Sequence, residues 1–303
     1  MHKFICISGC TASGKSSFAI ELADYFESPV IINADSLQVY DCWKILTDRP
    51  TEKKTMHDLY GHVSCNVNYS VGDWIKDVKN IFDLYSKNSK TFIFVGGTGL
   101  YFNALLNGLS QIPQIPEEIR DFANSCDLSF FLEGLNMNDP GILEKIDTNN
   151  RRRVQRAWEV LEATGKSILY WQSKNTSPLI SASNATLLLV ELGKEGLANR
   201  ISNRVNHMLE CGVIKEVEQV YNTCWDKKLP FAKAIGAEDI VSYLNGEISF
   251  EKLFKNIALK TRQFAKRQRT WQRNYMKDWH SINSAGLNRL DIKKIVKKVK
   301  AIN

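Results

Sequence analysis

The sequence predicts an α/β protein with a parallel sheet of the P-loop NTPase type, flanking helices and a mostly helical insertion. The first observation is a phosphate-binding loop pattern at 9–16, placed between a strand pattern and a helix pattern. The second is a series of short apolar runs that alternate with helical periodicity. The third is the stretch 114–183, in which helical patterns dominate and prolines mark the entrance.

The phosphate-binding loop follows the apolar run 4–7 and precedes the helical pattern 17–23. Its glycines let successive backbone N–H groups point into one cavity, and the helix N-terminus adds partial positive charge. Lys15 supplies a full charge, and the Ser16 hydroxyl can hold Mg²⁺, so we expect a bound di- or triphosphate. The predicted site consists of Gly9, Cys10, Thr11, Ala12, Ser13, Gly14, Lys15 and Ser16.

Further buried strands are predicted at 30–32, 91–95 and 187–190, and the helical pattern 71–85 fits a crossover between parallel strands. Asp35 follows the second strand, at the sheet edge where open α/β folds bind their ligands. Two roles are open to its carboxylate. It can take a proton from a nucleophile that attacks a bound phosphate compound, or it can cap a following helix.

The predicted core comprises 1–113 and 184–303, and the predicted insertion is 114–183. The clearest helix of the insertion covers 150–164 and ends at Gly165. Beyond the last strand the chain is again helical. These helices are predicted at 195–211, 214–222, 234–244 and 250–271.

Composition narrows the class of protein. The chain has 303 residues and a formal charge of +7, and no run approaches the ~20 apolar residues of a membrane span. The loop begins too near the N-terminus to leave room for a signal peptide. The seven cysteines are scattered, without a C-x-x-C pair, which predicts reduced thiols in a cytoplasmic protein rather than disulfides or a zinc site.

Basic side chains are concentrated at 151–156, 260–273 and 293–300, a distribution that indicates a polyanionic partner. Arg152 and Arg156 lie four residues apart and therefore share one face of a helix. Arginines at a helix start oppose the helix dipole. A phosphate ligand would compensate, and a solvated charged face is the alternative.

Arg200 and Arg204 form a second pair with the same spacing. A longer stripe runs along the helix predicted at 250–271 and contains Arg262, Lys266, Arg269 and Arg273. A basic stripe with nearby aromatic rings suits phosphate backbones and stacked bases, although solvent exposure alone also explains it. Trp271 itself is expected to pack in the core.

The third strand ends in a glycine stretch, Gly96–Gly99, where loop ATPases carry an acidic residue that helps to hold Mg²⁺. This absence disfavours an ATPase or a motor protein. The glycines allow close approach of the backbone to a ligand, or simply a tight turn from strand to helix.

Several of these stretches, taken together and in this order, are specific for one protein family. Besides the phosphate loop they are Asn33–Tyr40, Gly96–Phe102, Gly108–Ser110, Arg153–Val160 and Thr261–Gln268. With these stretches the chain resembles the bacterial tRNA dimethylallyltransferases, also called tRNA isopentenyltransferases. It departs from their usual pattern by Cys10 for Pro, Ser16 for Thr, Arg152 for Gln, and Ala237 for Tyr.

The resemblance implies transfer of a dimethylallyl group from dimethylallyl diphosphate to N6 of the adenosine immediately 3′ of the anticodon (position 37). The tRNAs concerned read codons that begin with U, and diphosphate is the leaving group, so ATP is not needed. The partners implied are the tRNA anticodon stem-loop and dimethylallyl diphosphate. We also expect a cytoplasmic protein that needs no membrane and no obligate protein partner, with a monomer as the default.

The resemblance further implies roles for individual residues. Asp35 would accept the proton or a hydrogen bond from the exocyclic amine, and Lys15, with Ser16 and Mg²⁺, would stabilise charge on the diphosphate. The implied tRNA contacts are Asp35, Ser36, Leu37, Gln38, Thr98, Arg120, Arg152, Arg153, Val154, Gln155, Arg156 and Lys233.

The same residues are compatible with two other functions. A small-molecule kinase would use the same loop, with Asp35 activating a substrate hydroxyl, but gives no reason for the basic helices. An RNA-binding protein with a nucleotide switch would need hydrolysis, which the glycine end of the third strand disfavours.

Overall fold

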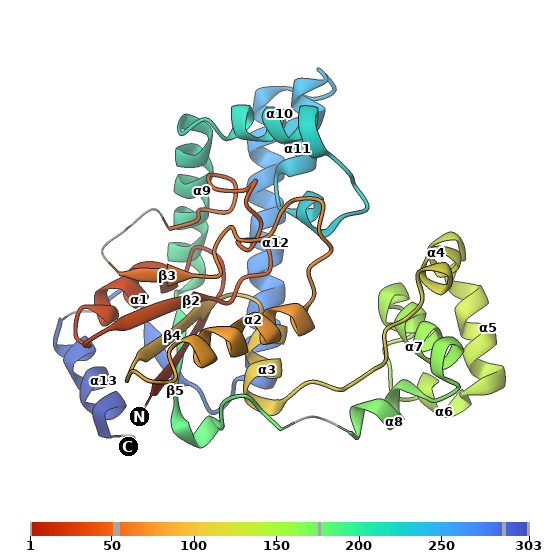
Figure 1. Ribbon diagram of the computed structural model, residues 1–303. Coiled ribbons are helices and arrows are strands. Elements are labelled where there is room, and N and C mark those ends of the chain that lie inside the picture. Colours follow the sequence, from red (N-terminus) through yellow and green to blue (C-terminus); the bar gives the residue numbers. More distant parts are fainter. Residues whose placement is uncertain (1, 51–54, 175–176, 287–288, 302–303) are drawn as a thin grey trace. The chain divides into compact units, whose positions relative to one another are not determined.

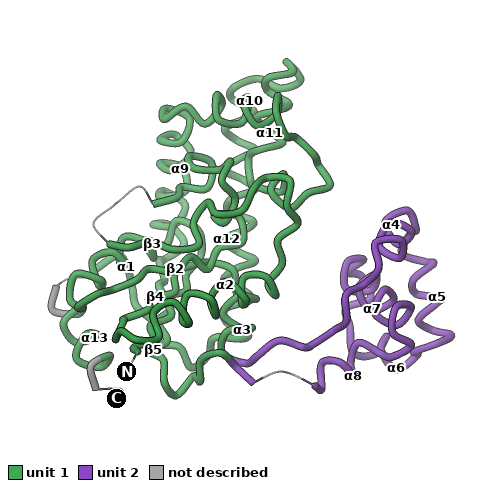
Figure 2. The backbone as a smooth tube through the Cα atoms, in the orientation of Figure 1, with its two compact units in different colours: residues 1–106, 179–303 green, residues 107–178 purple. Residues whose placement is uncertain are grey.

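The computed structural model describes residues 2–50, 55–174, 177–286 and 289–301. The chain divides into two compact units (Figure 2). Unit 1 consists of residues 1–106 and 179–303, and unit 2 of residues 107–178. The sequence predicts boundaries after residues 113 and 183, whereas the two units divide after residues 106 and 178.

Unit 1 is built on a parallel sheet. Within the described residues its strands are β1 (Lys3–Gly9), β2 (Pro29–Asn33), β3 (Met56–Asp58), β4 (Thr91–Gly96), β5 (Ala185–Glu191) and β6 (His280–Asn283). Their spatial order is β3-β2-β4-β1-β5-β6. The four central strands confirm the prediction, because their apolar runs are buried on both faces. The edge strands β3 and β6 escape prediction, because MHD and HSIN have no apolar run.

Helices cover both faces of the sheet (Figure 1). The helices of unit 1 that pack on it are α1 (Lys15–Ala23), α2 (Val71–Leu84), α3 (Gly99–Asn107) and α13 (Arg289–Ala301). Successive strand side chains point to opposite faces. Thus Ile5 and Ile7 pack with α1 and α13, whereas Cys6 packs with α2 and α3. Phe92 and Phe94 share the second face with Cys6.

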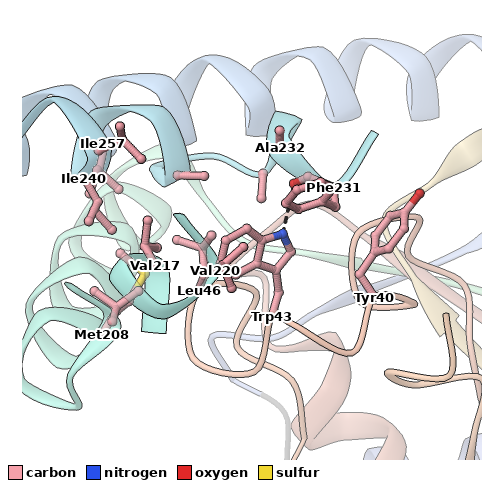
Figure 3. Packing of buried hydrophobic residues seen from close by; sticks show 14 of the residues in the cluster. Tyr40, Trp43, Leu46, Met208, Val217, Val220, Phe231, Ala232, Ile240 and Ile257 are labelled. Carbon is pink, nitrogen blue, oxygen red and sulfur yellow. Dashed lines mark hydrogen bonds between the residues drawn. The ribbon is translucent and has the colours of Figure 1, made fainter. Parts of the chain in front are cut away.

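A further group of helices adjoins the sheet: α9 (Lys194–Glu210), α10 (Val213–Cys224), η2 (Pro230–Lys233), α11 (Ala237–Leu244) and α12 (Phe250–Tyr275). They enclose a core together with the segment that follows β2 (Figure 3). In this core the indole N–H of Trp43 donates to the carbonyl of Phe231 at 2.9 Å, and both side chains are fully buried. The segment after β2 is therefore anchored to helices that lie far from it in the sequence.

Unit 2 is helical. Its helices are α4 (Glu117–Ser125), α5 (Leu128–Asn138), α6 (Pro140–Leu143), α7 (Arg151–Thr164) and α8 (Ile168–Gln172). The Asn150 side chain caps α7, and Gly165 ends it with a φ of 65°, as the sequence predicts. Phe131 and Leu135 from α5 pack against Trp158 from α7 in the centre of this unit.

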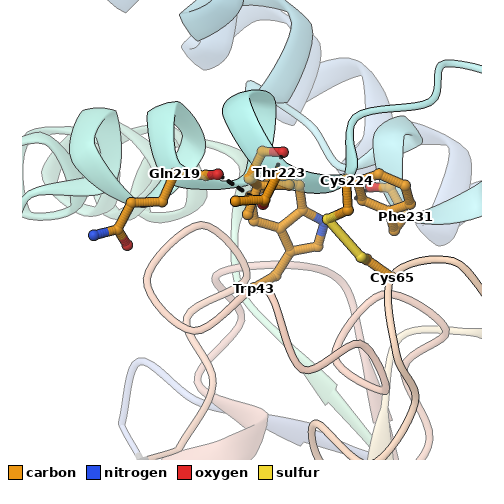
Figure 4. The surroundings of a disulfide bond; sticks show 7 residues. Trp43, Cys65, Gln219, Thr223, Cys224 and Phe231 are labelled. Carbon is orange, nitrogen blue, oxygen red and sulfur yellow. Dashed lines mark hydrogen bonds between the residues drawn. A yellow bond between two sulfur atoms is a disulfide. The ribbon is translucent and has the colours of Figure 1, made fainter.

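The cysteine prediction is corrected at one pair. Cys65, in the segment before α2, forms a disulfide with Cys224 at the end of α10 (Figure 4). Their sequence separation is 159 residues, so the pairing arises from the fold and not from local spacing. The free cysteines are Cys6, Cys10, Cys42, Cys126 and Cys211.

Among the described residues, no helix combines the length and the apolar character needed to cross a membrane.

Candidate active site

The phosphate-binding loop joins β1 to α1 and is shaped by its glycines. Gly14 has a φ of 90° and stands at the N-cap of α1, while Ala12 adopts a φ of 61°. A side chain at Gly9 would overlap Ser13 and the backbone of Val190. The first turn of α1 contains no acidic residue, so its N-terminal charge remains available to an anion.

The loop is fastened to α12 by Gln268. The side-chain oxygen of Gln268 accepts from the backbone N–H of Thr11 at 2.8 Å, and its amide donates to the carbonyl of Gly97 at 3.0 Å. The side chain is 7% exposed. One buried amide thereby fixes the phosphate loop relative to the end of β4. This contact gives a physical reason why the Thr261–Gln268 stretch and the phosphate loop occur together in the set of stretches that carries the family resemblance.

Two arginines of α9 converge on the same loop. Arg200 donates to the carbonyl of Ser13 at 3.0 Å, and Arg204 donates to the hydroxyl of Thr11 at 2.6 Å. Arg204 also pairs with Asp48 at 3.7 Å. The sequence shows the spacing of this pair but not that it contacts the phosphate loop, because only the fold brings α9 and the loop together. We therefore add both arginines to the candidate site.

Asp35 lies just beyond β2 and lines the same cavity as Lys15 and Ser16. Its Oδ1 accepts from the backbone N–H of Leu37 at 3.0 Å, and the backbone N–H of Asp35 donates to Oδ1 of Asn33 at 2.9 Å. Residues 36–39 form a turn, so Asp35 caps no helix and that alternative is wrong. The turn holds the carboxylate in place, as a positioned base requires.

Lys15 is the charged residue of the loop. Burial lowers the pKa of its ammonium, and the nearby Asp35 carboxylate is the largest opposing influence. The same burial raises the pKa of the Cys10 thiol, although the Lys15 and Arg269 charges act in the other direction. Cys10 is therefore a neutral, buried part of the loop.

The cavity that these residues line has a volume of about 560 Å³, and both polar and apolar side chains contribute to its lining. Its polar lining includes Thr11, Lys15, Ser16, Asp35, Gln38, Asp48, Arg200 and Arg204. Its apolar lining includes Leu37, Leu46, Val205, Met208, Ile235, Ile257 and Phe264. Such a cavity suits a molecule with an anionic end and a short hydrocarbon end.

The glycine stretch after β4 is explained by protein packing. A side chain at Gly96 would overlap the backbone of Ala34, and one at Gly97 or Gly99 would overlap Gln268 or Trp271 of α12. The close approach is thus to protein groups, in a tight turn from strand to helix, which is the second of the two alternatives that the sequence leaves open. Trp271 is part of the packing, as expected.

Thr98 and Gln38, both predicted to touch tRNA, form hydrogen bonds to the segment that follows β2. The Thr98 hydroxyl accepts from the backbone N–H of Ser36 at 3.0 Å. The Gln38 amide donates to the carbonyl of Thr47 at 2.8 Å. Ser36, Leu37 and Gln38 are all partly exposed. Lys233 is exposed at the end of η2.

In unit 2, Arg120, Arg152 and Arg153 are exposed, as a surface that meets RNA would need. Arg156 is half-buried and pairs with Glu159 at 3.5 Å. The helix start at Arg151 is compensated within the protein, because its guanidinium donates to the carbonyl of Cys126 at 2.6 Å and to the Gln155 side chain at 2.8 Å.

Two predicted tRNA contacts of α7 are corrected by burial. Val154 is 0% exposed and belongs to the core of unit 2. Gln155 is 8% exposed, and its amide donates to Asn124 and Glu159. A motif that spans a helix includes inward and outward positions alike, so these two side chains support the exposed arginines and offer no surface to RNA.

The sequence matches the family model described as IPP transferase over residues 38–275, which is more than half of the chain. This chain belongs to the IPP transferase family.

Relatives extend the match to nearly the whole IPP transferase chain. The tRNA dimethylallyltransferase of Ruegeria sp. (strain TM1040) is 41% identical over 282 residues, which cover 92% of this chain and 95% of the relative. That of Bartonella tribocorum is 42% identical over 281 residues, with coverages of 90% and 96%. The chain is therefore a transferase of this family.

Solved IPP transferase structures share the fold. The full-length tRNA isopentenylpyrophosphate transferase of Bacillus halodurans gives a TM-score of 0.71 at 26% identity, covering 100% of this chain and 97% of that one. A eukaryotic dimethylallyltransferase acting on tRNA gives 0.80 at 27% identity, covering 93% and 74%. The predicted α/β fold class is confirmed.

Proposed function

We propose that this protein transfers the dimethylallyl group of dimethylallyl diphosphate to N6 of the adenosine 3′ of the anticodon, in tRNAs that read codons beginning with U. The observation that carries the proposal is that one cavity is lined by the phosphate loop with its cationic neighbours, by apolar side chains, and by Asp35. Family membership gives the reaction class, and the cavity gives this chain the means to hold the donor.

The diphosphate binds at the loop. Lys15, Arg200 and Arg204 supply positive charge, and the loop N–H groups with the α1 N-terminus supply oriented donors. The five-carbon chain lies against apolar side chains such as Leu46, Val205 and Met208. Binding energy from both ends fixes the allylic carbon in the cavity.

The reaction balances without ATP. The adenosine is turned out of the anticodon loop, and its amine nitrogen attacks the allylic carbon. The new N–C bond forms as the C–O bond to diphosphate breaks, Asp35 takes the amine proton, and diphosphate leaves with the bonding electron pair. Lys15 and the two α9 arginines stabilise that leaving charge.

The residues fit a magnesium ion held largely by the substrate. Within the described chain no group of three His, Cys, Asp or Glu side chains is arranged to hold a metal, whereas Ser16 lines the cavity beside Lys15. Mg²⁺ commonly keeps waters and uses few protein ligands plus phosphate oxygens. When bound, it would neutralise charge on the departing diphosphate, with the Ser16 hydroxyl as its protein ligand.

The tRNA binds through exposed cations. Arg120, Arg152 and Arg153 of unit 2 present one set. On α12, Arg262, Lys266 and Arg273 are exposed on the stripe that the sequence predicts. These suit a phosphate backbone, which needs accessible charge rather than a buried pocket. We further propose that the protein works in the cytoplasm as a monomer, where its two substrates are found.

The test is incubation of the purified protein with unmodified tRNA and labelled dimethylallyl diphosphate, followed by digestion to nucleosides. We expect label in N6-modified adenosine without added ATP. A kinase would instead transfer label from ATP to a metabolite and leave the tRNA unlabelled. Absence of label in tRNA with folded protein contradicts the proposal.

A further inference from the structure

The segment between β2 and β3 contains an anion-binding turn that is occupied by the protein itself. The carboxylate of Glu216, in the first turn of α10, accepts three consecutive backbone N–H groups. Its Oε1 accepts from Lys44 at 2.9 Å and from Ile45 at 2.8 Å. Its Oε2 accepts from Leu46 at 2.8 Å. Successive amides that converge on one carboxylate form a rigid arrangement.

This turn leads directly into the substrate cavity. Leu46 is 4% exposed and belongs to the apolar lining of the cavity. The next two carbonyls, of Thr47 and Asp48, accept from the Gln38 amide at 2.8 and 3.3 Å. The Asp48 carboxylate then pairs with Arg204, the arginine that donates to the phosphate loop. Displacement of the turn would therefore disturb both Leu46 in the apolar lining and the ion pair that holds Arg204.

We propose that Glu216 is a positioning residue for the prenyl diphosphate: it touches no substrate but fixes the cavity wall that does. The inference rests on the proposed function for the identity of that substrate. Glu216 is partly buried and bound to the segment far from it in sequence, whereas Glu218 on the same helix is exposed. The two glutamates thus provide a matched pair.

The carboxylate is required for a stated reason. Its two oxygens accept three N–H groups, a task for which a glutamine has only one oxygen. Glu216→Gln keeps the size of the side chain but turns an NH₂ group toward a backbone donor. Glu216→Ala removes all three acceptor contacts and leaves partly buried amides unpaired.

The experiment compares Glu216→Gln with Glu218→Gln at saturating tRNA. We expect the KM for dimethylallyl diphosphate to rise about tenfold in Glu216→Gln, with kcat within about threefold of the wild type, because the displaced lining binds the donor less tightly in the ground state and the transition state alike. Glu218→Gln should match the wild type. Amide hydrogen exchange at 44–46 should be faster in Glu216→Gln alone, and Glu216→Ala should show a larger rise in KM.

Two results overturn the inference. One is a wild-type KM in Glu216→Gln, even if the melting temperature falls, because that makes the contact purely structural. The other is unchanged amide exchange at 44–46. If the wild type transfers nothing to tRNA, the proposed function fails instead. In that case amide exchange and the affinity for inorganic diphosphate still decide the role of Glu216.

Discussion

Unit 1 and unit 2 each carry a pair of arginines four residues apart on a helix, and the two pairs differ in what holds them. On α9, Arg200 and Arg204 donate to the phosphate loop, so protein groups hold their guanidinium groups in place. On α7, Arg152 is exposed and Arg156 pairs with its own helix. Fixed cations suit a compact diphosphate, and accessible cations suit an extended RNA backbone. The proposed function therefore assigns two kinds of ligand to arginine pairs of equal spacing.

The largest effect is expected at Asp35, because neither arginine pair can replace its carboxylate as a proton acceptor. Asp35→Ala should lower kcat by roughly a thousandfold, because the amine loses its proton acceptor. The dissociation constant for tRNA should stay near the wild-type value, since the exposed cations remain. Single-turnover transfer and filter binding measure the two quantities. A loss of tRNA affinity as large as the loss of rate would make Asp35 a positioning residue.

Arg204→Ala is expected to have the next largest effect. Loss of a charge-assisted contact to the diphosphate should raise the KM for dimethylallyl diphosphate by about 10- to 100-fold, with tRNA affinity unchanged. Arg204→Lys keeps the charge but loses the planar donor group, so its KM should lie between those of the wild type and Arg204→Ala. Steady-state kinetics at saturating tRNA give these values. Weaker tRNA binding in Arg204→Ala would remove the distinction between the two pairs.

Arg152→Ala and Arg153→Ala should act on the other ligand. Each should weaken tRNA binding by a few-fold and reduce the slope of log K against log salt by about one, because one phosphate contact is lost. The KM for dimethylallyl diphosphate should not change. Titrations of tRNA at several salt concentrations provide the test. An unaltered slope would assign both arginines to a solvated face.

Alkaline pH should weaken the binding of diphosphate in the unit 1 cavity, by less than the substitutions above. Burial lowers the pKa of Lys15 from its ordinary 10.5, so its positive charge is lost at a lower pH than that of a free lysine. The protonated form attracts diphosphate, and inhibition by inorganic diphosphate should therefore weaken as the pH rises. Inhibition constants between about pH 7.5 and about pH 9.5 measure this change. Inorganic diphosphate should inhibit Lys15→Ala poorly and without that dependence on pH.

The sequence predicted the residues whose roles depend on local order. The phosphate loop, the four central strands and Asp35 follow from apolar runs and glycine spacing, and the structure confirms their arrangement. Arg200, Arg204 and Gln268 could not be assigned to the loop, because only tertiary packing brings α9 and α12 to it.

Burial accounts for the remaining differences. A motif in one helix was predicted as a continuous RNA contact, yet Val154 points into the core of unit 2. The glycines after β4 were compatible with a ligand, and the structure assigns their close contacts to Ala34 and α12. The Cys65–Cys224 pairing likewise depends on a contact between distant segments.

The central claim is that one cavity in unit 1 holds the prenyl donor for attack by a tRNA adenosine. The most direct measurement counts the diphosphate released and the dimethylallyl groups incorporated, using a tRNA with adenosine 3′ of the anticodon and the same tRNA with guanosine there. We predict one diphosphate per modified adenosine in the first tRNA and neither product in the second. Diphosphate release that is independent of the tRNA, or equal labelling of the guanosine tRNA, would contradict the claim.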